Sequence, residues 1–291
     1  MTEMTTESLA DHWSREGYIV VRGIFDTDLV SRLKPICEST LDQWLVENPE
    51  KGEPGNGRDA HVMRHLNHPG YNDPVPGGPT AILEAASHPS VLETVEEILA
   101  EPPLFRCTSF YFNPSETSLD GNWHRDSQFR SNSDEEEKKL MEVRAHPAKG
   151  VQMQVALEPS DDIEFVPRSH VRWDTDEEYH IRKADDFANN RSNDMPGAVR
   201  IPLEPGDALA FNPLGLHRGR YHTDKRRRTI MLTYAAASST SFDYFTDQPW
   251  FLSDGYLDGL SPAAVDFYNA YIAAYGEDWK TRSDARPYPP K

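Results

Sequence analysis

The sequence predicts a mainly β fold, a sandwich or barrel, with helices flanking it. Short apolar runs separated by Gly, Pro and Asp turns dominate residues 103–240, and this pattern is typical of antiparallel strands rather than of βαβ units. Apolar residues at helical spacing occur mainly before residue 100 and after residue 255. The 291 residues allow two average domains or one large β unit. We expect one domain, 1–291, with a helical part (about 5–100), a β core (about 103–240) and a C-terminal helix and tail (255–291).

The N-terminal part is expected to contain three helices. Apolar residues recur there at helical spacing over 5–16, over 26–48 and from 88–90 onward. Thr5 or Thr6 is the expected N-cap of the first helix, and Asp26 is that of the second. Pro35 lies inside the second pattern and is expected to kink or break that helix.

Two other N-terminal segments are not expected to be helical. Tyr18–Val21 is β-branched and aromatic, which predicts a strand. Residues 49–79 are rich in glycine and proline, yet they include His61, His65 and Tyr71. A long irregular segment inside a compact domain is usually a functional lid or else disordered, and both interpretations stay open.

The middle of the chain is expected to form the strands of the core. Their patterns span 105–112, 150–157, 197–203, 207–211 and 229–235. The acidic run Asp134–Glu137 is expected to be a solvated face or a mobile loop. Residues 261–280 predict a last helix, and the proline-rich end is expected to be extended.

Composition excludes several classes of function. With 48 acidic and 30 basic residues the formal charge is −18, which argues against nucleic-acid binding, since that needs a basic face. No apolar run approaches the ~20 residues that span a bilayer. Cys37 and Cys107 are too few for a disulfide scaffold or a thiolate zinc site. The first residues lack the pattern of a signal peptide, so we expect a soluble, cytoplasmic protein.

His124 and Asp126 are the first candidate metal ligands. They follow a strand and a turn that contains Gly121. Side chains two residues apart on extended backbone point the same way, so an imidazole and a carboxylate can converge on one ion. Two histidines and one carboxylate suit ferrous iron and leave positions open for other ligands.

A third ligand must come from elsewhere in the chain. His217 follows a turn and a strand and is the preferred candidate, with His222 as its competitor. We expect His222 to be a loop or substrate-pocket residue. His170 and His180 fall in predicted turns and loops, where a role in metal binding is not favoured.

Polar side chains on two predicted strands could bind a cosubstrate. Arg228 lies eleven residues after His217, on one face with Ile230, and a guanidinium on a rigid strand can grip a carboxylate bidentately. We expect Arg228 to face inward and its basic neighbours outward. Gln152 and Gln154 share a face that looks either into the barrel or into solvent.

Taken together, these motifs resemble the phytanoyl-CoA dioxygenase (PhyH) family over roughly residues 15–240. The resemblance rests on Trp123-His124-Arg125-Asp126, on the run Glu164–His170, and on Pro205-Gly206-Asp207 before a distal histidine and arginine. It implies a double-stranded β-helix, a jelly-roll or cupin-like core, in an Fe(II)- and 2-oxoglutarate-dependent oxygenase. In this family His124, Asp126 and His217 match the iron ligands, and Arg228 matches the residue that binds the distal carboxylate of 2-oxoglutarate. Arg168 stands where many relatives have glycine in the turn of this run, and the turn can accommodate arginine if the φ angle of this residue stays negative.

The resemblance also implies a reaction, in which dioxygen and 2-oxoglutarate are consumed, succinate and CO2 are released, and a substrate is hydroxylated. Asp126 favours hydroxylation over halogenation, since halogenating relatives lack that carboxylate; desaturation, epoxidation and rearrangement stay open. We expect the substrate to be a small metabolite or natural-product intermediate, with candidate contacts Arg125, Phe129, Trp173 and His222. Arg125 should point away from the metal, to bind a substrate anion or to pair with a carboxylate. The alternatives are a cupin-like metal-dependent isomerase and a binding protein without turnover. The sequence predicts no oligomeric state.

Overall fold

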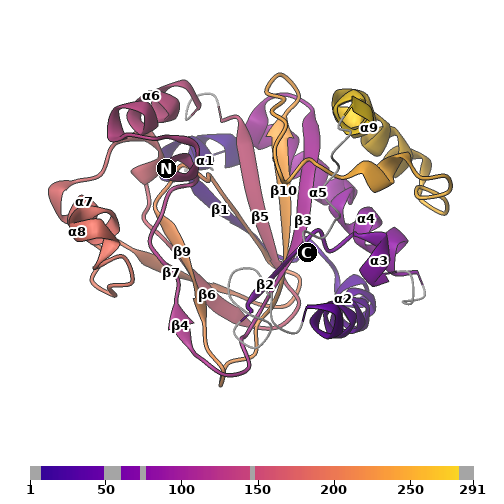
Figure 1. The fold of residues 1–291 in the computed structure, drawn as a ribbon, viewed down its shortest axis with the longest axis horizontal. Coiled ribbons are helices and arrows are strands. Elements are labelled where there is room, and N and C mark those ends of the chain that lie inside the picture. The colour runs from indigo at the N-terminus through magenta and orange to yellow at the C-terminus, as the bar shows by residue number, and fades with distance from the viewer. Residues whose placement is uncertain (1–7, 49–59, 73–76, 145–147, 282–291) are drawn as a thin grey trace, which may run out of the picture.

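The computed structural model describes residues 8–48, 60–72, 77–144 and 148–281. Two antiparallel sheets form its core (Figure 1). The main sheet has the strand order β1 (Tyr18–Val21), β8 (Ala208–Phe211), β5 (Gly150–Ala156), β10 (Arg228–Ala236), β3 (Pro103–Phe112) and β2 (Val62–Arg64). The smaller sheet has the order β4 (Leu119–Asp120), β9 (His217–Tyr221), β6 (Ser160–Phe165) and β7 (Val199–Leu203). This is the predicted β core, a double-stranded β-helix with flanking helices.

Apolar side chains of both sheets meet inside the barrel. Phe165 and Ile201 of the smaller sheet form one buried cluster with Leu209, Phe211 and Met231 of the main sheet. Burial of this cluster removes apolar area from water and so stabilises the closed barrel. The cluster fills only part of the interior, and the remainder is an open cavity described below.

Helices cover the outer face of the main sheet and the edges of the barrel. Their bounds are α1 (Leu9–Glu16), α2 (Thr27–Glu47), α3 (Pro69–Asn72), α4 (Gly78–Ala86), α5 (Pro89–Leu99), α6 (Asp134–Arg144), α7 (Asp176–Arg182), α8 (Ala184–Phe187) and α9 (Pro262–Thr281). Helices α2, α4, α5 and α9 lie against the main sheet, whereas α6, α7 and α8 lie beside the smaller one (Figure 1). In the part of the chain that is described, no helix is both long and apolar enough to cross a membrane.

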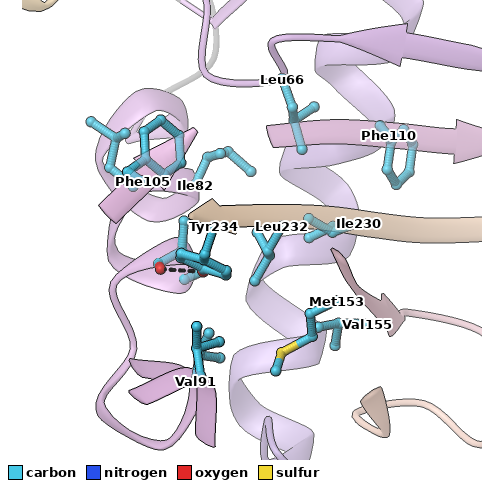
Figure 2. Close-up of a cluster of buried hydrophobic side chains, with 14 of the residues drawn as sticks. Leu66, Ile82, Val91, Phe105, Phe110, Met153, Val155, Ile230, Leu232 and Tyr234 are labelled. Carbon is cyan, nitrogen blue, oxygen red and sulfur yellow. Dashed lines mark hydrogen bonds between the residues drawn. The ribbon is translucent and has the colours of Figure 1, made fainter. Parts of the chain in front are cut away.

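The outer face of the main sheet carries the larger hydrophobic core. Along β10, Ile230, Leu232 and Tyr234 project into this core, as Figure 2 shows. The Tyr234 hydroxyl donates a 2.6 Å hydrogen bond to the Ala86 carbonyl oxygen at the end of α4. Residues between them on the strand, such as Met231, face the barrel interior instead. Strand alternation therefore separates an apolar outer face from an inner face that borders the cavity.

Several local expectations need correction. Helix α2 is continuous through Pro35, so of the expected kink or break the break does not occur, and Asp26 caps the helix as expected. The first helix is capped by Ser8; Thr5 and Thr6 lie outside the described residues. Asp134–Glu137 is not a loop but the first turn of α6, in which Glu135 and Glu136 are exposed as expected whereas Glu137 is fully buried.

The glycine- and proline-rich segment contains structure where it is described. Residues 62–64 form β2, the edge strand of the main sheet, which pairs with β3. Helix α4 begins at Gly78 with a proline in its first turn, and this helix is not among the predicted ones. Residues 49–59 and 73–76 lie outside the described residues. The described part of this segment is therefore built into the fold.

Candidate metal centre

His124, Asp126 and His217 meet at one end of the barrel. His124 and His217 form a short antiparallel bridge, with backbone N–O distances of 3.1 and 3.0 Å. The Asp126 amide donates to the Pro213 carbonyl oxygen at 2.8 Å. Nε2 of His124 and Nε2 of His217 lie 3.7 and 3.8 Å from the same oxygen, Oδ1 of Asp126. One possible ligand atom from each residue lies within 4.8 Å of the other two, so a single ion can be shared by all three.

Backbone carbonyls fix the orientation of both imidazoles. Nδ1 of His124 lies 2.7 Å from the Asn122 carbonyl oxygen, and Nδ1 of His217 lies 2.9 Å from that of Gly215. Because a carbonyl oxygen only accepts, each Nδ1 is the donor and each Nε2 keeps its lone pair for a metal. Burial and the nearby His124 lower the pKa of His217 to about 4, which keeps that ring neutral.

A cavity of about 900 Å³ opens beside the three ligands and extends between the two sheets. It is lined by the metal-ligand candidates and by side chains of β3, β5, β9 and β10. Gln152 on β5 donates to Oδ2 of Asp126 at 2.5 Å, and Gln154 lies one step further along the same face. Both glutamines therefore point into the barrel, one of the two orientations left open by the sequence.

The expected position of Arg228 is wrong. Its Nε donates to Glu38 of α2 at 2.6 Å and its Nη1 to Asn113 at 2.9 Å, so the side chain lies on the helix-covered side of the sheet. Arg228 shares strand parity with Ile230 and Leu232, and that face packs against the helices. Thr229 and Thr233 lie on the other face of β10, and their polarity could have indicated from the sequence that this face, not that of Arg228, borders the cavity.

Arg227 takes the inward position instead. It is 1% exposed, and its guanidinium carbon lies 5.1 and 4.8 Å from the ring centres of Tyr111 and Tyr221. Nη2 donates to Gln154 Oε1 at 3.1 Å and Nη1 to the Arg220 carbonyl oxygen at 3.1 Å. Arg227 has no carboxylate partner among the residues that the structure describes.

Of the four predicted substrate contacts, only Phe129 lines the cavity. Its ring is 70% exposed and its centre lies 5.6 Å from that of His124. Trp173 does not line the cavity; the cationic groups of Lys138, Lys183 and Arg182 lie over its ring.

The other two predicted substrate contacts are held by carboxylates. Arg125 is fully buried and pairs with Asp174 at 2.7 Å, so of its two expected roles the structure has the carboxylate pairing. His222 lies 3.0 Å from Asp120 and does not line the cavity. Asp174 and Asp120 thus bind the side-chain nitrogens of Arg125 and His222 with which a substrate would have to form hydrogen bonds.

A buried ionic network, of which only a carboxylate partner for Arg125 was expected, supports the segment that carries His124 and Asp126. Arg125 donates to the Ser169 and Leu214 carbonyl oxygens at 2.5 and 2.6 Å. Asp174 also pairs with Arg182 at 2.6 Å, and Arg182 pairs with Glu137 at 3.0 Å. Each buried charge thus has an opposite partner, which offsets the cost of removing it from water.

Two further sequence expectations have an outcome here. Arg168 has φ +65°, so this turn is left-handed and the condition of a negative φ is not met. Its guanidinium pairs with Glu16 at 2.9 Å and lowers the pKa of that carboxyl to about 2. His170 is buried, with Nε2 3.2 Å from the Ser14 carbonyl oxygen, and His180 lies beside Asn189; neither belongs to the metal-ligand cluster.

Comparisons with known proteins identify the family and the fold. The sequence profile of the phytanoyl-CoA dioxygenase (PhyH) family matches residues 13–229. A search of curated proteins found no significant match. EctD from S. alaskensis, solved with 2-oxoglutarate and 5-hydroxyectoine, is a similar structure, with 18% identity, TM-score 0.58 and coverage of 91% of this chain and 88% of that one.

Two similar structures come from nogalamycin biosynthesis. The carbocyclase SnoK has 17% identity and TM-score 0.58, with 90% of this chain and 92% of that chain covered. The epimerase SnoN, solved with Fe3+, alpha ketoglutarate and nogalamycin RO, has 19% identity and TM-score 0.55, with 83% and 89% covered. At these identities the similarity shows the fold alone. The family profile covers well over half of the sequence, and the chain therefore belongs to the phytanoyl-CoA dioxygenase (PhyH) family.

Proposed function

We propose that this protein is an Fe(II)- and 2-oxoglutarate-dependent oxygenase that hydroxylates a small metabolite or natural-product intermediate. The observation that carries the proposal is a two-histidine, one-carboxylate cluster on a cavity whose wall residues Gln154, Tyr111 and Tyr221 contact a buried arginine, Arg227. A metal-binding protein of another kind has no need for a buried guanidinium with no carboxylate partner of its own.

The three ligand candidates fit ferrous iron. Two neutral imidazole nitrogens and one carboxylate oxygen form the facial triad that non-haem Fe(II) oxygenases use. The Asp126 side chain is 32% exposed and that of His124 25%, so the cluster is open on the cavity side. Gln152 holds the second oxygen of Asp126, which leaves the first oxygen oriented toward the histidines.

The cavity also fits a short dicarboxylate. Gly219 lies two residues beyond His217 on β9, and a Cβ atom there would stand 2.5 Å from Tyr221 Oη and 3.0 Å from Arg227 Nη1. A side chain at this position would therefore occupy the space between the ligands and the arginine. Nε of Arg227 is buried and has no hydrogen-bond partner, so a carboxylate could satisfy it.

These residues would have different roles in the reaction. Bound Fe(II) and 2-oxoglutarate would supply the oxidising chemistry with dioxygen, releasing succinate and CO2. His124, Asp126 and His217 would hold the metal, while Arg227 and Gln154 would bind the distal carboxylate of the cosubstrate. The apolar cluster around Phe211 and Met231 would keep water from the barrel interior. The similar structures SnoN and SnoK are named as an epimerase and a carbocyclase. The proposal therefore has two parts, namely the oxygenase class and hydroxylation as its particular reaction, and each needs its own test.

Succinate formation tests the class of reaction. Purified protein reconstituted with Fe(II) under nitrogen should bind 2-oxoglutarate, and on exposure to air it should form succinate with an accepted substrate. A mass increase of one oxygen atom in the product would support hydroxylation, whereas an unchanged substrate mass would favour isomerisation. Protein that binds Fe(II) but neither binds nor consumes 2-oxoglutarate contradicts the proposal.

A further inference from the structure

The charges that line the cavity are opposite in sign to the charge of the chain. Among described residues, the lining includes one carboxylate, Asp126, but six cationic side chains: Arg64, Arg106, Arg130, Lys149, Arg191 and Arg218. The whole chain has a formal charge of −18. Lys149 and Arg218 pair with Glu101 and Glu164, and Arg106 and Arg130 share Asp243. The remaining positive charge of the lining favours an anionic ligand, because the local field, rather than the net charge, acts at the site.

We propose that the substrate is an organic acid with an apolar body, whose anionic group binds to Arg64 and Arg106. This inference rests on the proposed function, since it names the class of molecule that the same cavity accepts as substrate. The two arginines lie on neighbouring strands of the main sheet and both border the segment 239–245, which also lines the cavity.

Arg64 has hydroxyl and aromatic contacts but no opposite charge. Its Nη1 donates to Tyr111 Oη at 3.2 Å and to Ser109 Oγ at 3.4 Å, and its guanidinium carbon lies 5.4 Å from the Phe245 ring centre. No described carboxylate pairs with Arg64. A guanidinium removed from bulk water without an anion is costly, and a bound carboxylate or phosphate would offset that cost.

Arg106 reaches the cavity through a local irregularity of β3. Thr233 pairs with Cys107 and Tyr234 with Phe105, so Arg106 is the extra residue of a β-bulge. A bulge reverses the alternation of side chains, which turns Arg106 toward the cavity side. Arg106 and Arg130 share a single carboxylate, Asp243, at 2.6 and 2.8 Å, and one positive charge is left uncompensated.

The cosubstrate does not account for these charges. Under the proposed function, one carboxylate of 2-oxoglutarate binds the metal and the other binds Arg227. Arg64 and Arg227 contact the same ring, with guanidinium carbons 5.7 and 5.1 Å from the centre of Tyr111. Arg64 also lies 5.4 Å from the Phe245 ring centre, in the segment that Arg106 contacts at Ser241. A second anion at this segment would pair with Arg64 and Arg106 while the cosubstrate pairs with Arg227.

Two exposed aromatic rings indicate the apolar body of the substrate. Phe129 and Phe187 line the cavity and are 70% and 43% exposed. Leu140 lies on the same lining. Large apolar side chains exposed together at a cavity are typical of a ligand-binding surface, since a ligand removes them from water. Phe129 lies beside His124, so an apolar body there would be held next to the metal.

Matched acids and amides test the proposal by binding alone. Phenylacetate, 3-phenylpropionate and 2-naphthoate, each with its uncharged primary amide, would be titrated calorimetrically into protein that holds Mn(II) and 2-oxoglutarate under nitrogen. A charge-assisted hydrogen bond predicts that at least one acid binds about 10- to 100-fold more tightly than its amide. Arg64→Met and Arg106→Met should each remove most of that preference, and Arg64→Lys should retain part of it.

The controls separate this proposal from the proposed function. Arg200→Met removes an exposed arginine that pairs with Asp161 and does not line the cavity, and it should leave the acid preference unchanged. Equal affinities of every acid and its amide, or no binding of any compound, would overturn the proposal. So would a loss of 2-oxoglutarate affinity in Arg64→Met as large as that in Arg227→Met, because Arg64 would then belong to the cosubstrate site. Failure to bind Mn(II) or 2-oxoglutarate contradicts the proposed function instead, and the acid preference is then measured on the metal-free protein.

Discussion

The two faces of the main sheet are built on the same strands but differ in what they contact. The outer face of β10 presents Ile230, Leu232 and Tyr234 to the helices, all at most 1% exposed. The inner face presents Met231 and Thr233 to a cavity of about 900 Å³. Apolar packing therefore determines the outer face, whereas the inner face keeps open space and polar groups. Stability is concentrated on one side of the sheet and chemistry on the other.

The largest expected effect comes from removing a metal ligand on the inner side. His217→Ala should abolish retention of Fe(II), because two ligands remain where three converge. His222→Ala should retain the metal, since His222 contacts Asp120 outside the cavity. Metal content after dialysis measures both variants. Metal loss in His222→Ala alone would show that the wrong histidine has been assigned.

Adjacent arginines on opposite faces give a second, sharper contrast. Arg227→Met should weaken 2-oxoglutarate binding by about 2–5 kcal/mol, or about 30- to 5,000-fold, since a buried charge partner is lost. Arg228→Met should leave that affinity almost unchanged and lower stability slightly, because it removes a partly buried ion pair with Glu38. Anaerobic calorimetry with Mn(II) and 2-oxoglutarate separates them. The reverse order of effects would place Arg228 in the cosubstrate site.

The comparison of Arg227 with Arg228 also shows which features of the site can be predicted from the sequence. The convergence of His124, Asp126 and His217 was predictable, because H-x-D on extended backbone and a histidine after a strand are local patterns, and the structure brings all three together. The facing of Arg228 was not, since strand parity shows which residues share a face but not which face meets the cavity. The apolar partners Ile230 and Leu232 determine that choice through helix packing.

Contacts between distant segments account for most of the other differences. Glu137 was expected in a solvated run, yet Arg182, 45 residues later, buries it by forming an ion pair. Arg106 enters the cavity only because β3 has a bulge opposite Thr233, and pairing irregularities leave no pattern in a single strand. Sequence periodicity predicted the long helices α2, α5 and α9 and six of the strands, because each follows its own apolar spacing. It did not predict α3, α4, α6, α7 and α8, or the strands β2, β4, β6 and β9.

Truncations on the two faces should differ in stability. Leu232→Ala removes a fully buried side chain from the outer core and should lower the free energy of unfolding by about 2–5 kcal/mol. Thr233→Ala, on the half-buried inner face, should lower it by less than about 1 kcal/mol. Urea denaturation followed by circular dichroism measures both values. Equal losses would mean that the inner face is packed as tightly as the outer one.

A pH dependence of stability is also expected to arise on the outer side. His65 is fully buried beside Trp250, and burial, together with the nearby His68, lowers its pKa to about 3. Its pKa in the unfolded chain is about 6.5, so the unfolded state binds a proton that the folded state excludes as the pH falls between these values. Stability should therefore decrease by about 2 kcal/mol from about pH 7 to about pH 5 through this residue alone.

His65→Gln isolates that contribution, since glutamine does not titrate. The difference in unfolding free energy between about pH 7 and about pH 5 should be smaller in His65→Gln than in the unsubstituted protein by about 2 kcal/mol. Histidines that do not interact with His65, such as His217, remain in both proteins and cancel in this comparison. An identical pH dependence in the two proteins would mean that His65 accepts a proton in the folded state, and hence that water reaches this part of the outer core.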